Sequence, residues 1–452
     1  MTLQTDLRDF DDFESLQDEI IGFSSLGIRP GLRRISRLLS LLGDPQNQIP
    51  AIQILGTNGK GSTAAAIEAM LKTGLRTSLY TSPHLVSMQE RLRVDGQYMP
   101  VDTWRSSWRI IMEAVIGDAE LNADKPSFFE HFTALCMFMT HEAEAEIAIL
   151  EAGMGGRCDA TSTCVPMAAM INPIGMDHMQ YLGSTIEEIA REKFAAIKAG
   201  ADAFYAGDDP ALESLFLEHC SRAGARPHIL DNIARPVDIR CTLDKTGFSY
   251  EAAREIGGVN KIEGLETPLP GPHQACNATR AITVLLSLKE KHDMFSFISP
   301  DSIRESLKRT DWPGRFEVFR TTGGPAVILD GAHNEHAMRT LVSAVNSMTD
   351  RGEKIKVAAA VLAIMSDKDI PPMLDALGAL KCPVYCAELP MERAMRADEL
   401  AGMCNAAGIE VAGYFIDPSE ALKAAENKAK QGEFILCCGS LFLVGYVRRM
   451  VK

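Results

Sequence analysis

The stretch that decides the fold is Gly56-Thr57-Asn58-Gly59-Lys60-Gly61-Ser62-Thr63, within a chain of 452 residues. It follows the mostly apolar run Ile52–Leu55 and precedes the helix-forming stretch Ala64–Lys72. A strand, a glycine-rich loop and a helix in this order form a cradle for phosphate, because glycines let backbone N–H groups converge on an anion and the helix N-terminus adds its dipole. In such a cradle Lys60 places its charge on the β- and γ-phosphates, and Ser62 or Thr63 offers a hydroxyl to a metal or a phosphate oxygen.

The spacing of this loop differs from the general nucleotide-binding pattern. Two residues separate Gly56 from Gly59, and Gly61 stands between Lys60 and Ser62. The alternative is a glycine-rich turn that Ser62 merely caps. Because the glycines and Lys60 fall at a strand-to-helix junction, the context favours binding of nucleotide phosphates.

Composition excludes several classes of protein. Hydrophobic residues make up 46% and charged residues 23% of the chain, as in soluble globular proteins, and the length predicts about two to four domains. The net charge of −14 disfavours nonspecific binding to nucleic acid or an anionic membrane. No stretch approaches the roughly 18 apolar residues of a membrane span, and residues 1–20 lack a secretory signal, so we expect no nucleic-acid and no membrane partner. Eleven scattered cysteines without a CxxC motif predict reduced, mostly buried thiols and a cytoplasmic location.

Short apolar runs alternate with helical patterns along most of the chain. Apolar runs with little alternation are typical of parallel strands buried on both faces, so the sequence predicts an α/β fold with helices on each side of the sheets. The predicted strands are Ala51–Leu55, Thr77–Tyr80, Glu146–Leu150, Met167–Ile171, Ala203–Ala206, Ala326–Leu329, Ile355–Val361, Pro383–Ala387 and Phe434–Cys437.

A break near Phe295–Pro313 predicts two domains. Residues 1–310 form a large N-terminal domain of the P-loop ATPase type with a parallel sheet, and residues 311–452 form a smaller, Rossmann-like α/β domain. The segment Ile239–Glu263 is polar, contains glycine and shows some alternation, which predicts a small β excursion within the first domain.

Ser82, Glu151 and His178 each lie shortly after a predicted strand. In open parallel sheets ligands bind at the carboxyl ends of the strands, and Glu151 is where a phosphate-loop enzyme needs a carboxylate for Mg²⁺. The alternatives stay open at this point. Glu151 fits a surface position, Ser82 fits either a metal ligand or a cap, and His178, whose nitrogen Mg²⁺ does not prefer, fits an ordinary polar histidine.

A lysine falls in the apolar stripe of a predicted helix. Ser184 and Glu187 predict a capping box, from which the helix runs toward Lys198. Lys193 lies seven residues after Ile186, on the apolar face. Such a lysine either extends to water or has a specific role, and a buried lysine has a lowered pKa and a neutral amine that can be modified.

Together these residues resemble the folylpolyglutamate synthase/dihydrofolate synthase family within the Mur-ligase superfamily, and the resemblance covers most of the chain. Each motif alone is modest, but nine of them in the family's order are highly specific. They are GTNGKGST (Gly56–Thr63), TSPHL (Thr81–Leu85), EAGMGGRCDAT (Glu151–Thr161), DHMQYLG (Asp177–Gly183), REK (Arg191–Lys193), HQACNA (His273–Ala278), WPGRFE (Trp312–Glu317), DGAHN (Asp330–Asn334) and GSLFLVG (Gly439–Gly445).

The resemblance implies an ATP-dependent ligase with the glutamate-ligase domain at residues 311–452. ATP phosphorylates the carboxylate of a dihydropteroate or folate, and the amino group of L-glutamate attacks the acyl phosphate to give an amide, ADP and phosphate. The resemblance implies catalytic roles for Lys193, which matches the family's carbamoylated lysine, and for His333 and Ser440 near the glutamate. Ser82, Glu151 and His178 are implied as Mg²⁺ ligands. The implied ATP-binding residues are Gly59, Lys60, Gly61, Ser62, Asn277, Arg315 and Asp330.

The site for the acceptor substrate is the least determined. Phe128 and Phe129 offer aromatic faces that can stack on a flat pterin ring, and buried phenylalanines at a helix start are the alternative. Ser162, Glu335 and Met154 depart from the family's usual Asn, Pro and Leu, which leaves open the preference between dihydropteroate and tetrahydrofolate. We expect a monomer.

Two other functions compete with this one. A nucleotide-gated binding protein would use the phosphate loop, but it would not need Lys193 in an apolar stripe or the motifs of the second domain. Another Mur-type ligase, acting on a cell-wall precursor, would carry an additional N-terminal domain, whereas only about 50 residues precede the phosphate loop.

Overall fold

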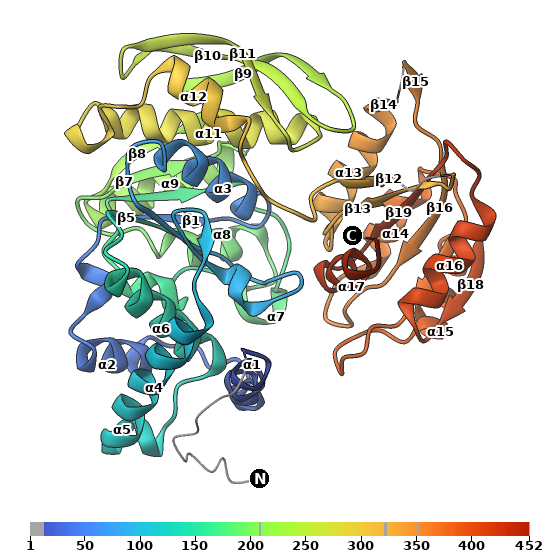
Figure 1. The fold of residues 1–452 in the computed structure, drawn as a ribbon. Helices are drawn as coiled ribbons and strands as arrows, with labels where there is room; N and C mark the ends of the chain where they lie inside the picture. Colours follow the sequence, from blue (N-terminus) through green and yellow to red (C-terminus); the bar gives the residue numbers. More distant parts are fainter. Residues whose placement is uncertain (1–12, 208, 321–322, 351, 452) are drawn as a thin grey trace.

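The computed structural model describes residues 13–207, 209–320, 323–350 and 352–451. Residues 1–12, part of the stretch examined for a secretory signal, lie outside them. Figure 1 shows two bodies side by side: an N-terminal body that ends with helix α12 (Pro300–Leu307) and a C-terminal body that begins with strand β12 (Glu317–Arg320). The α/β fold class that the sequence predicts is confirmed.

An eight-stranded sheet in the order β4-β3-β2-β5-β1-β6-β7-β8 forms the centre of the N-terminal body. Strands β2, β5, β1, β6, β7 and β8 are parallel, while β3 and β4 add an antiparallel edge. The strands are β1 (Ala51–Leu55), β2 (Thr77–Tyr80), β3 (Leu92–Val94), β4 (Gln97–Tyr98), β5 (Ile147–Glu151), β6 (Ala168–Ile171), β7 (Asp202–Tyr205) and β8 (Arg226–Ile229). Strand β1 is buried at every position, as expected for a strand covered on both faces.

Helices cover both faces of this sheet, as the continuous apolar strands require. Ile52 and Ile54 of β1 face a core formed with α3 (Lys60–Leu71) and α11 (Pro272–Lys289). Ala51 and Leu55 point to the other face, where two further clusters of apolar side chains lie. The helices of the other face include α1 (Phe13–Gly22), α2 (Arg33–Leu41), α4 (Val101–Gly117), α6 (Phe128–Glu142), α8 (Ile186–Phe194) and α9 (Pro210–Ala223); the short helices of this body are α5 (Ala119–Ala123), α7 (Met179–Leu182) and α10 (Leu230–Ile233).

The predicted β excursion is a three-stranded antiparallel sheet that packs on α11 (Figure 1). It is longer at both ends than the sequence indicates and consists of β9 (Ala234–Cys241), β10 (Thr246–Ile256) and β11 (Val259–Thr267). Its inner face, with Phe248, Tyr250 and Leu265, joins the core beneath α11, which therefore lies between this small sheet and the central one.

The C-terminal body contains a six-stranded sheet in the order β12-β13-β19-β16-β17-β18. All neighbours are parallel except β12 and β13, which form an antiparallel edge. The strands are β12, β13 (Ala326–Leu329), β16 (Val357–Leu362), β17 (Val384–Ala387), β18 (Val411–Phe415) and β19 (Phe434–Cys438), with a separate hairpin of β14 (Thr349–Asp350) and β15 (Glu353–Lys354). The helices are α13 (Glu335–Ser347), α14 (Ile370–Gly378), α15 (Ala397–Ala406), α16 (Pro418–Lys428) and α17 (Leu441–Val451).

One local prediction is wrong by a single residue. Thr185, not Ser184, caps α8, and Glu188, not Glu187, bonds back to it, so the capping box begins one residue later. The helix also ends at Phe194, before the predicted Lys198. Lys193 nevertheless keeps its predicted place on the buried face of α8.

None of the helices in the described parts of the chain is long and apolar enough to cross a membrane. All eleven cysteines are free, and most of them are buried.

Candidate active site

The phosphate loop is covered by two side chains from distant parts of the chain. Gly59 has a left-handed backbone, with φ of 81°, and serves as N-cap of α3. A Cβ atom on Gly59 would lie 2.8 Å from Oδ1 of Asn277, and one on Gly61 would lie 2.3 Å from the indole of Trp312. Glycine is therefore required here for close packing as well as for backbone freedom. The Lys60 ammonium folds back and donates to the carbonyl of Thr57 at 3.2 Å.

Two buried polar groups around this loop lack hydrogen-bond partners. In the described residues, neither Nε1 of Trp312 nor Nδ1 of His273 has a hydrogen-bond partner. His273 lies at the start of α11, four residues before Asn277, and charge from Arg315 and His336 reaches it. Buried polar groups of folded proteins are normally hydrogen-bonded, so this part of the chain suits a ligand rich in acceptors, such as a nucleotide.

Glu151 ends strand β5 beside Ser82. Its carboxylate accepts a hydrogen bond of 3.2 Å from the backbone N–H of Ser82, which precedes Pro83 in a cis peptide bond. Burial raises the pKa of Glu151, and the charges of Lys60 and Arg315 oppose that rise. A buried carboxylate surrounded by cationic groups, next to a hydroxyl residue, fits the requirements of a Mg²⁺ ligand.

His178 follows strand β6 and begins α7 with a left-handed backbone, φ 52°. Burial lowers its pKa to about 4, so the imidazole is neutral at physiological pH and has a lone pair for a metal. No cluster of three or more His, Cys, Asp or Glu suited to a metal occurs in the described ranges. A Mg²⁺ held by Ser82, Glu151 and His178 would therefore take its remaining ligands from phosphate oxygens and water, as Mg²⁺ commonly does.

Lys193 extends from α8 to the phosphate loop. Its ammonium donates a hydrogen bond of 2.9 Å to the carbonyl oxygen of Gly56, so the helix stripe leads this side chain into the site and not to water. Burial lowers the pKa of Lys193 to about 7, and the neighbouring charge of Lys60 acts in the same direction. A substantial fraction of the amine is therefore neutral near physiological pH.

The C-terminal body contributes the other predicted residues. Burial raises the pKa of Asp330, and its carboxylate accepts from the backbone N–H groups of Phe316 and Ala332, each at 2.9 Å. Arg315, in the segment that connects the bodies, is half-buried, and the charges of Asp330 in the C-terminal body and of Glu151 in the N-terminal body both act on it. His333 lies in the loop after β13, with Nδ1 2.8 Å from the carbonyl of Gly331, and Ser440 precedes α17.

Phe128 and Phe129 lie at the N-terminus of α6, fixed by a capping box between Ser127 and Glu130. Both rings are half-buried. A Cβ atom on Gly153 would lie 2.5 Å from the ring of Phe129, so this ring packs on the loop that follows Glu151. The ring of Phe129 is thus close in space to the candidate metal ligand Glu151, on the side where an aromatic acceptor could lie.

A polar cluster that the sequence did not reveal joins the two bodies. Asp177 accepts a hydrogen bond of 2.6 Å from Lys368, and Asn334 donates to it at 3.2 Å. Asn334 also exchanges hydrogen bonds of 3.0 and 3.2 Å with Asn58 of the phosphate loop. Lys368 lies six residues after strand β16, in the polar stretch Ser366–Lys368, and this stretch between a buried strand and the next helix is the signal available in the sequence. Asp177 and Asn334 lie within recognised motifs, but the motifs did not show that they meet.

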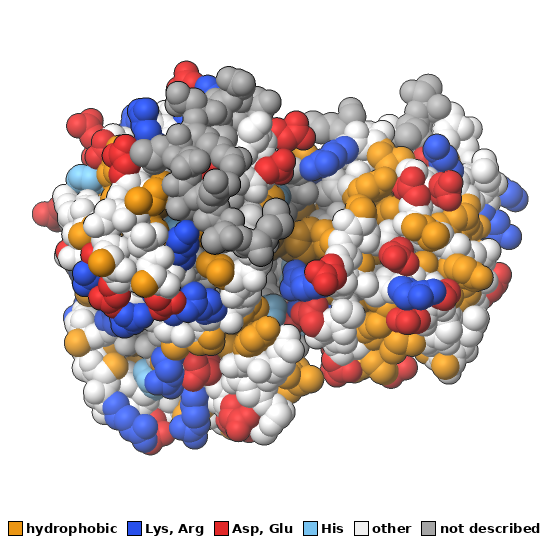
Figure 2. Space-filling view, turned by 90° about the horizontal axis from the view of Figure 1, so that it is seen from below, with side chains coloured by type: hydrophobic (Ala, Val, Ile, Leu, Met, Phe, Trp, Pro, Cys, Tyr) orange, Lys and Arg blue, Asp and Glu red, His pale blue; other side chains and the backbone are white. Residues whose placement is uncertain are grey.

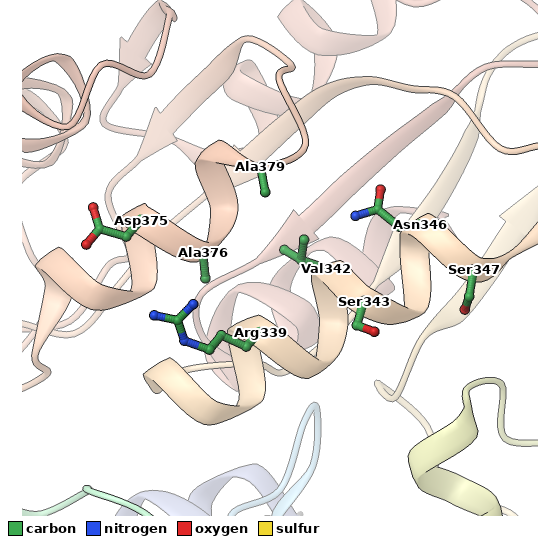
Figure 3. A pocket seen from close by; sticks show the side chains of 8 residues that line it. All are labelled: Arg339, Val342, Ser343, Asn346, Ser347, Asp375, Ala376 and Ala379. Atoms are coloured by element: carbon green, nitrogen blue, oxygen red, sulfur yellow. The ribbon is translucent and has the colours of Figure 1, made fainter.

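A narrow cleft lies between the bodies, lined by Thr81 and Pro83 on one side, Leu441 on the other, and Trp312 and Arg315 of the connecting segment. Seen from below, a furrow separates the two bodies (Figure 2). A second hollow of about 490 Å³ lies within the C-terminal body between α13 and α14. Figure 3 shows its lining, with Arg339 and Val342 of α13 beside Ala376 of α14.

Comparison with known families matches both bodies. The Mur ligase middle domain matches residues 54–285, and the Mur ligase glutamate ligase domain matches residues 314–441. The dihydrofolate synthase/folylpolyglutamate synthase of Escherichia coli is 30% identical, with 93% of this chain and 91% of that protein covered. The chain belongs to the folylpolyglutamate synthase/dihydrofolate synthase family of Mur ligases. It is therefore an ATP-dependent ligase, and the family's reaction is the addition of glutamate to folates.

Other relatives extend the similarity over whole chains. The bifunctional enzyme of Bacillus subtilis, of the same name, is 29% identical over 98% of this chain and 100% of its own length. Among solved structures, Mycobacterium tuberculosis folylpolyglutamate synthase complexed with ADP matches with a TM-score of 0.86 and 28% identity, covering 98% of this chain and 99% of that one. E. coli FolC in complex with DHPP and ADP matches with a TM-score of 0.82 and 29% identity, covering 97% of each chain.

Proposed function

We propose that this ligase adds L-glutamate to dihydropteroate, to a reduced folate, or to both, through an acyl phosphate formed between its two bodies. The observation that carries the proposal is the meeting of Lys60, Glu151 and Arg315. Lys60 of the phosphate loop and Arg315 of the segment that connects the bodies both act electrostatically on this buried carboxylate. A reaction between a carboxylate and a triphosphate needs such cationic groups to offset charge as the transition state forms.

In the first step a carboxylate oxygen of the acceptor attacks the γ-phosphorus of ATP, and the bond from that phosphorus to the bridging oxygen of ADP breaks. Gly59, Gly61 and Ser62 would hold the phosphates through backbone N–H groups and a hydroxyl, with Lys60 and Arg315 offsetting their charge. Asn277 and Asp330 would hold the remainder of the nucleotide from opposite sides of the cleft. Mg²⁺, when bound to Ser82, Glu151 and His178, would neutralise negative charge on the phosphates.

In the second step the neutral amino group of glutamate attacks the acyl carbon, phosphate leaves, and the nitrogen loses a proton. His333 and Ser440 would bind this glutamate. They follow β13 and β19, neighbouring strands of the C-terminal sheet, so both belong to the body that faces the phosphate loop. Because the acyl phosphate hydrolyses in water, the two bodies must stay closed between the steps.

We propose further that Lys193 is carbamoylated. Its neutral amine would attack CO₂, forming an N–C bond and releasing one proton, and the resulting carbamate would be an anionic oxygen ligand near the metal. Since the pKa of Lys193 is about 7, uptake of ¹³C-labelled CO₂, followed by NMR, should rise as the pH increases through about 7. A Lys193→Met variant should show no such signal and little ligase activity; full activity in that variant would contradict a catalytic role.

A substrate panel tests the function itself. Purified protein, ATP, Mg²⁺ and L-glutamate are combined with dihydropteroate, folate or tetrahydrofolate, and products are identified by mass. ADP release should require glutamate and a pteroate or folate together. ADP release that ignores both would favour a nucleotide-gated binding protein, and turnover only with another acceptor class would favour a different Mur-type ligase. Light scattering on the same purified protein tests whether it is a monomer. The cytoplasmic location stays a prediction.

A further inference from the structure

Arg91 is a buried arginine without a counterion. It ends the short helix Met88–Arg91 directly before β3, and only 7% of its surface is exposed. Its Nε donates a hydrogen bond of 2.9 Å to Nδ1 of His84. Among the residues that the structure describes, no carboxylate lies within ion-pair distance of Arg91, and its two terminal nitrogens have no hydrogen-bond partner.

An unpaired buried guanidinium is costly, because it loses water without gaining a counterion. His84 does not remove this cost. Its Nδ1 accepts the single hydrogen bond from Nε of Arg91, and an imidazole carries no negative charge that could balance the guanidinium. Arg93, a buried arginine two residues further on in β3, shows the usual solution, a 2.6 Å ion pair with Glu68. Arg91 therefore offers free N–H donors that something outside the chain can satisfy.

The surroundings of Arg91 restrict what that partner is. Its guanidinium carbon lies 5.4 Å from the ring centroids of both Phe128 and Phe132, which are stacked on each other at 5.9 Å. The negative charge of Glu151 also acts on Arg91. Arg91 thus lies against an aromatic wall and within electrostatic reach of the carboxylate at the reaction centre. Its partner has a flat, apolar face and acceptor atoms at its edge.

We propose that Arg91 determines specificity for the acceptor substrate by donating hydrogen bonds to the ring acceptors of a planar heteroaromatic group that lies against Phe128 and Phe129. This rests on the proposed function, in which the acceptor joins a pterin to an aminobenzoate. The pterin carries a carbonyl oxygen and ring nitrogens that accept hydrogen bonds. The carboxylate end of the acceptor does not need Arg91, because Lys60 and Arg315 already supply cations there.

Equilibrium binding tests the assignment with three probes: pteroic acid, pterin-6-carboxylic acid and 4-aminobenzoic acid, the first two by pterin fluorescence and the third by competition. In Arg91→Met the Kd for both pterin probes should rise about 10- to 100-fold, the range expected for a hydrogen bond to a charged group. The Kd for 4-aminobenzoic acid and the KM for ATP should stay within about twofold, on the same scale. Arg91→Lys, which keeps the charge but loses the planar fork, should recover part of the affinity.

Arg93→Met is the matched control, at a buried arginine two residues further along the chain. It should lower the melting temperature by leaving Glu68 unpaired and leave pterin affinity unchanged. An equal loss for 4-aminobenzoic acid in Arg91→Met would overturn the proposal, because the arginine would then bind the carboxylate. Unchanged pterin affinity in both Arg91 variants would also overturn it and leave a structural role through His84. Wild-type protein that neither binds pteroic acid nor turns over would instead overturn the proposed function.

Discussion

Two buried aspartates have similar electrostatics and different consequences. Asp202 is 1% exposed at the start of β7 and contacts Arg226 and His228 at 2.8 Å each, and Lys291. Asp177 is 6% exposed and contacts Lys368 at 2.6 Å and His333 at 3.6 Å. Burial raises the pKa of each carboxyl, yet the hydrogen bonds and charges of these partners outweigh it and hold both pKa values well below the usual range.

The difference lies in where the partners come from. Arg226 and His228 are on β8, next to β7 in the same sheet, and Lys291 follows α11 of the same body. Lys368 and His333 instead belong to the C-terminal body, so the network of Asp177 exists only while the two bodies are closed. The first network stabilises a domain, and the second stabilises an arrangement of domains. The same chemistry therefore holds together one body in one place and the contact between two bodies in the other.

The largest effect is expected for Lys368→Met, which removes the interdomain partner of Asp177. Breaking a buried ion pair costs about 3–5 kcal/mol, and if that cost falls on the closed arrangement, kcat/KM for the acceptor should drop roughly 100-fold or more. The melting temperature should change little, because Asp177 regains water when the bodies open. ADP release without ligation should become a larger share of turnover, since water reaches the acyl phosphate.

The matched control for this variant is Lys356→Met. Lys356 is an exposed lysine of the same body whose ion pair with Glu433 lies at the surface, where such pairs contribute little. Steady-state assays that measure ADP and amide product in parallel give the coupling ratio. A Lys368→Met variant with the coupling ratio of wild type would show that this contact does not hold the bodies together.

Asp202→Asn should lower the stability of the fold and leave the coupling of ADP release to ligation unchanged. It weakens charge-assisted hydrogen bonds within one body and should lower the free energy of unfolding by about 1–3 kcal/mol, with kcat and KM close to those of wild type. Urea unfolding followed by circular dichroism measures the first and a ligase assay the second. Glu266→Gln, which removes an exposed pair with Lys245, is the control and should have a much smaller effect. A large change in coupling on Asp202→Asn would contradict the separation between the two networks.

The sequence predicts the centre of each sheet better than its edges. The strands Ala51–Leu55, Thr77–Tyr80 and Ala326–Leu329 match the structure at both ends, because strands buried on both faces read as continuous apolar runs. Edge strands β8 and β18 were not predicted, since their residues are largely exposed or alternate in burial. The capping box of α8 shifted by one residue because Ser184 and Thr185 are both good N-caps and only packing selects between them.

The residues of the candidate site likewise fall into those that the sequence predicts and those that it does not. Residues that follow buried strands, such as Glu151 and His178, are visible in the sequence because their position relative to the sheet is local information. The packing of Trp312 on Gly61 and the contact between Asp177 and Lys368 join segments far apart in the chain. Residue spacing within the sequence therefore cannot predict them. Arg91 is missed for another reason: an arginine in sequence says nothing about whether a carboxylate will be near it. The roles of the predicted site residues remain predictions for the experiments above.

The contribution of Asp202 to stability should depend on pH. A carboxyl whose folded pKa is depressed contributes stability above its unfolded pKa of about 3.9, and that contribution is lost as the pH falls toward the folded pKa. The stability difference between wild type and Asp202→Asn should therefore be constant near neutrality and shrink below about pH 4. Thermal melts between neutral and acid pH measure it. A difference that grows on acidification would contradict a depressed pKa.

The smallest effect expected is the coupling energy between the two networks, measured when both are broken in one protein. Sites that share no partner add within about 0.3–0.5 kcal/mol, so the unfolding free energy of the Lys368→Met/Asp202→Asn double variant should equal the sum of the single changes within that margin. Its coupling ratio should equal that of Lys368→Met alone. Asn334→Ala combined with Lys368→Met should instead be non-additive in activity, because both side chains bond to Asp177. Non-additivity between Lys368 and Asp202 would mean that closure of the cleft reaches the far edge of the sheet, and the two aspartates would then belong to one cooperative network.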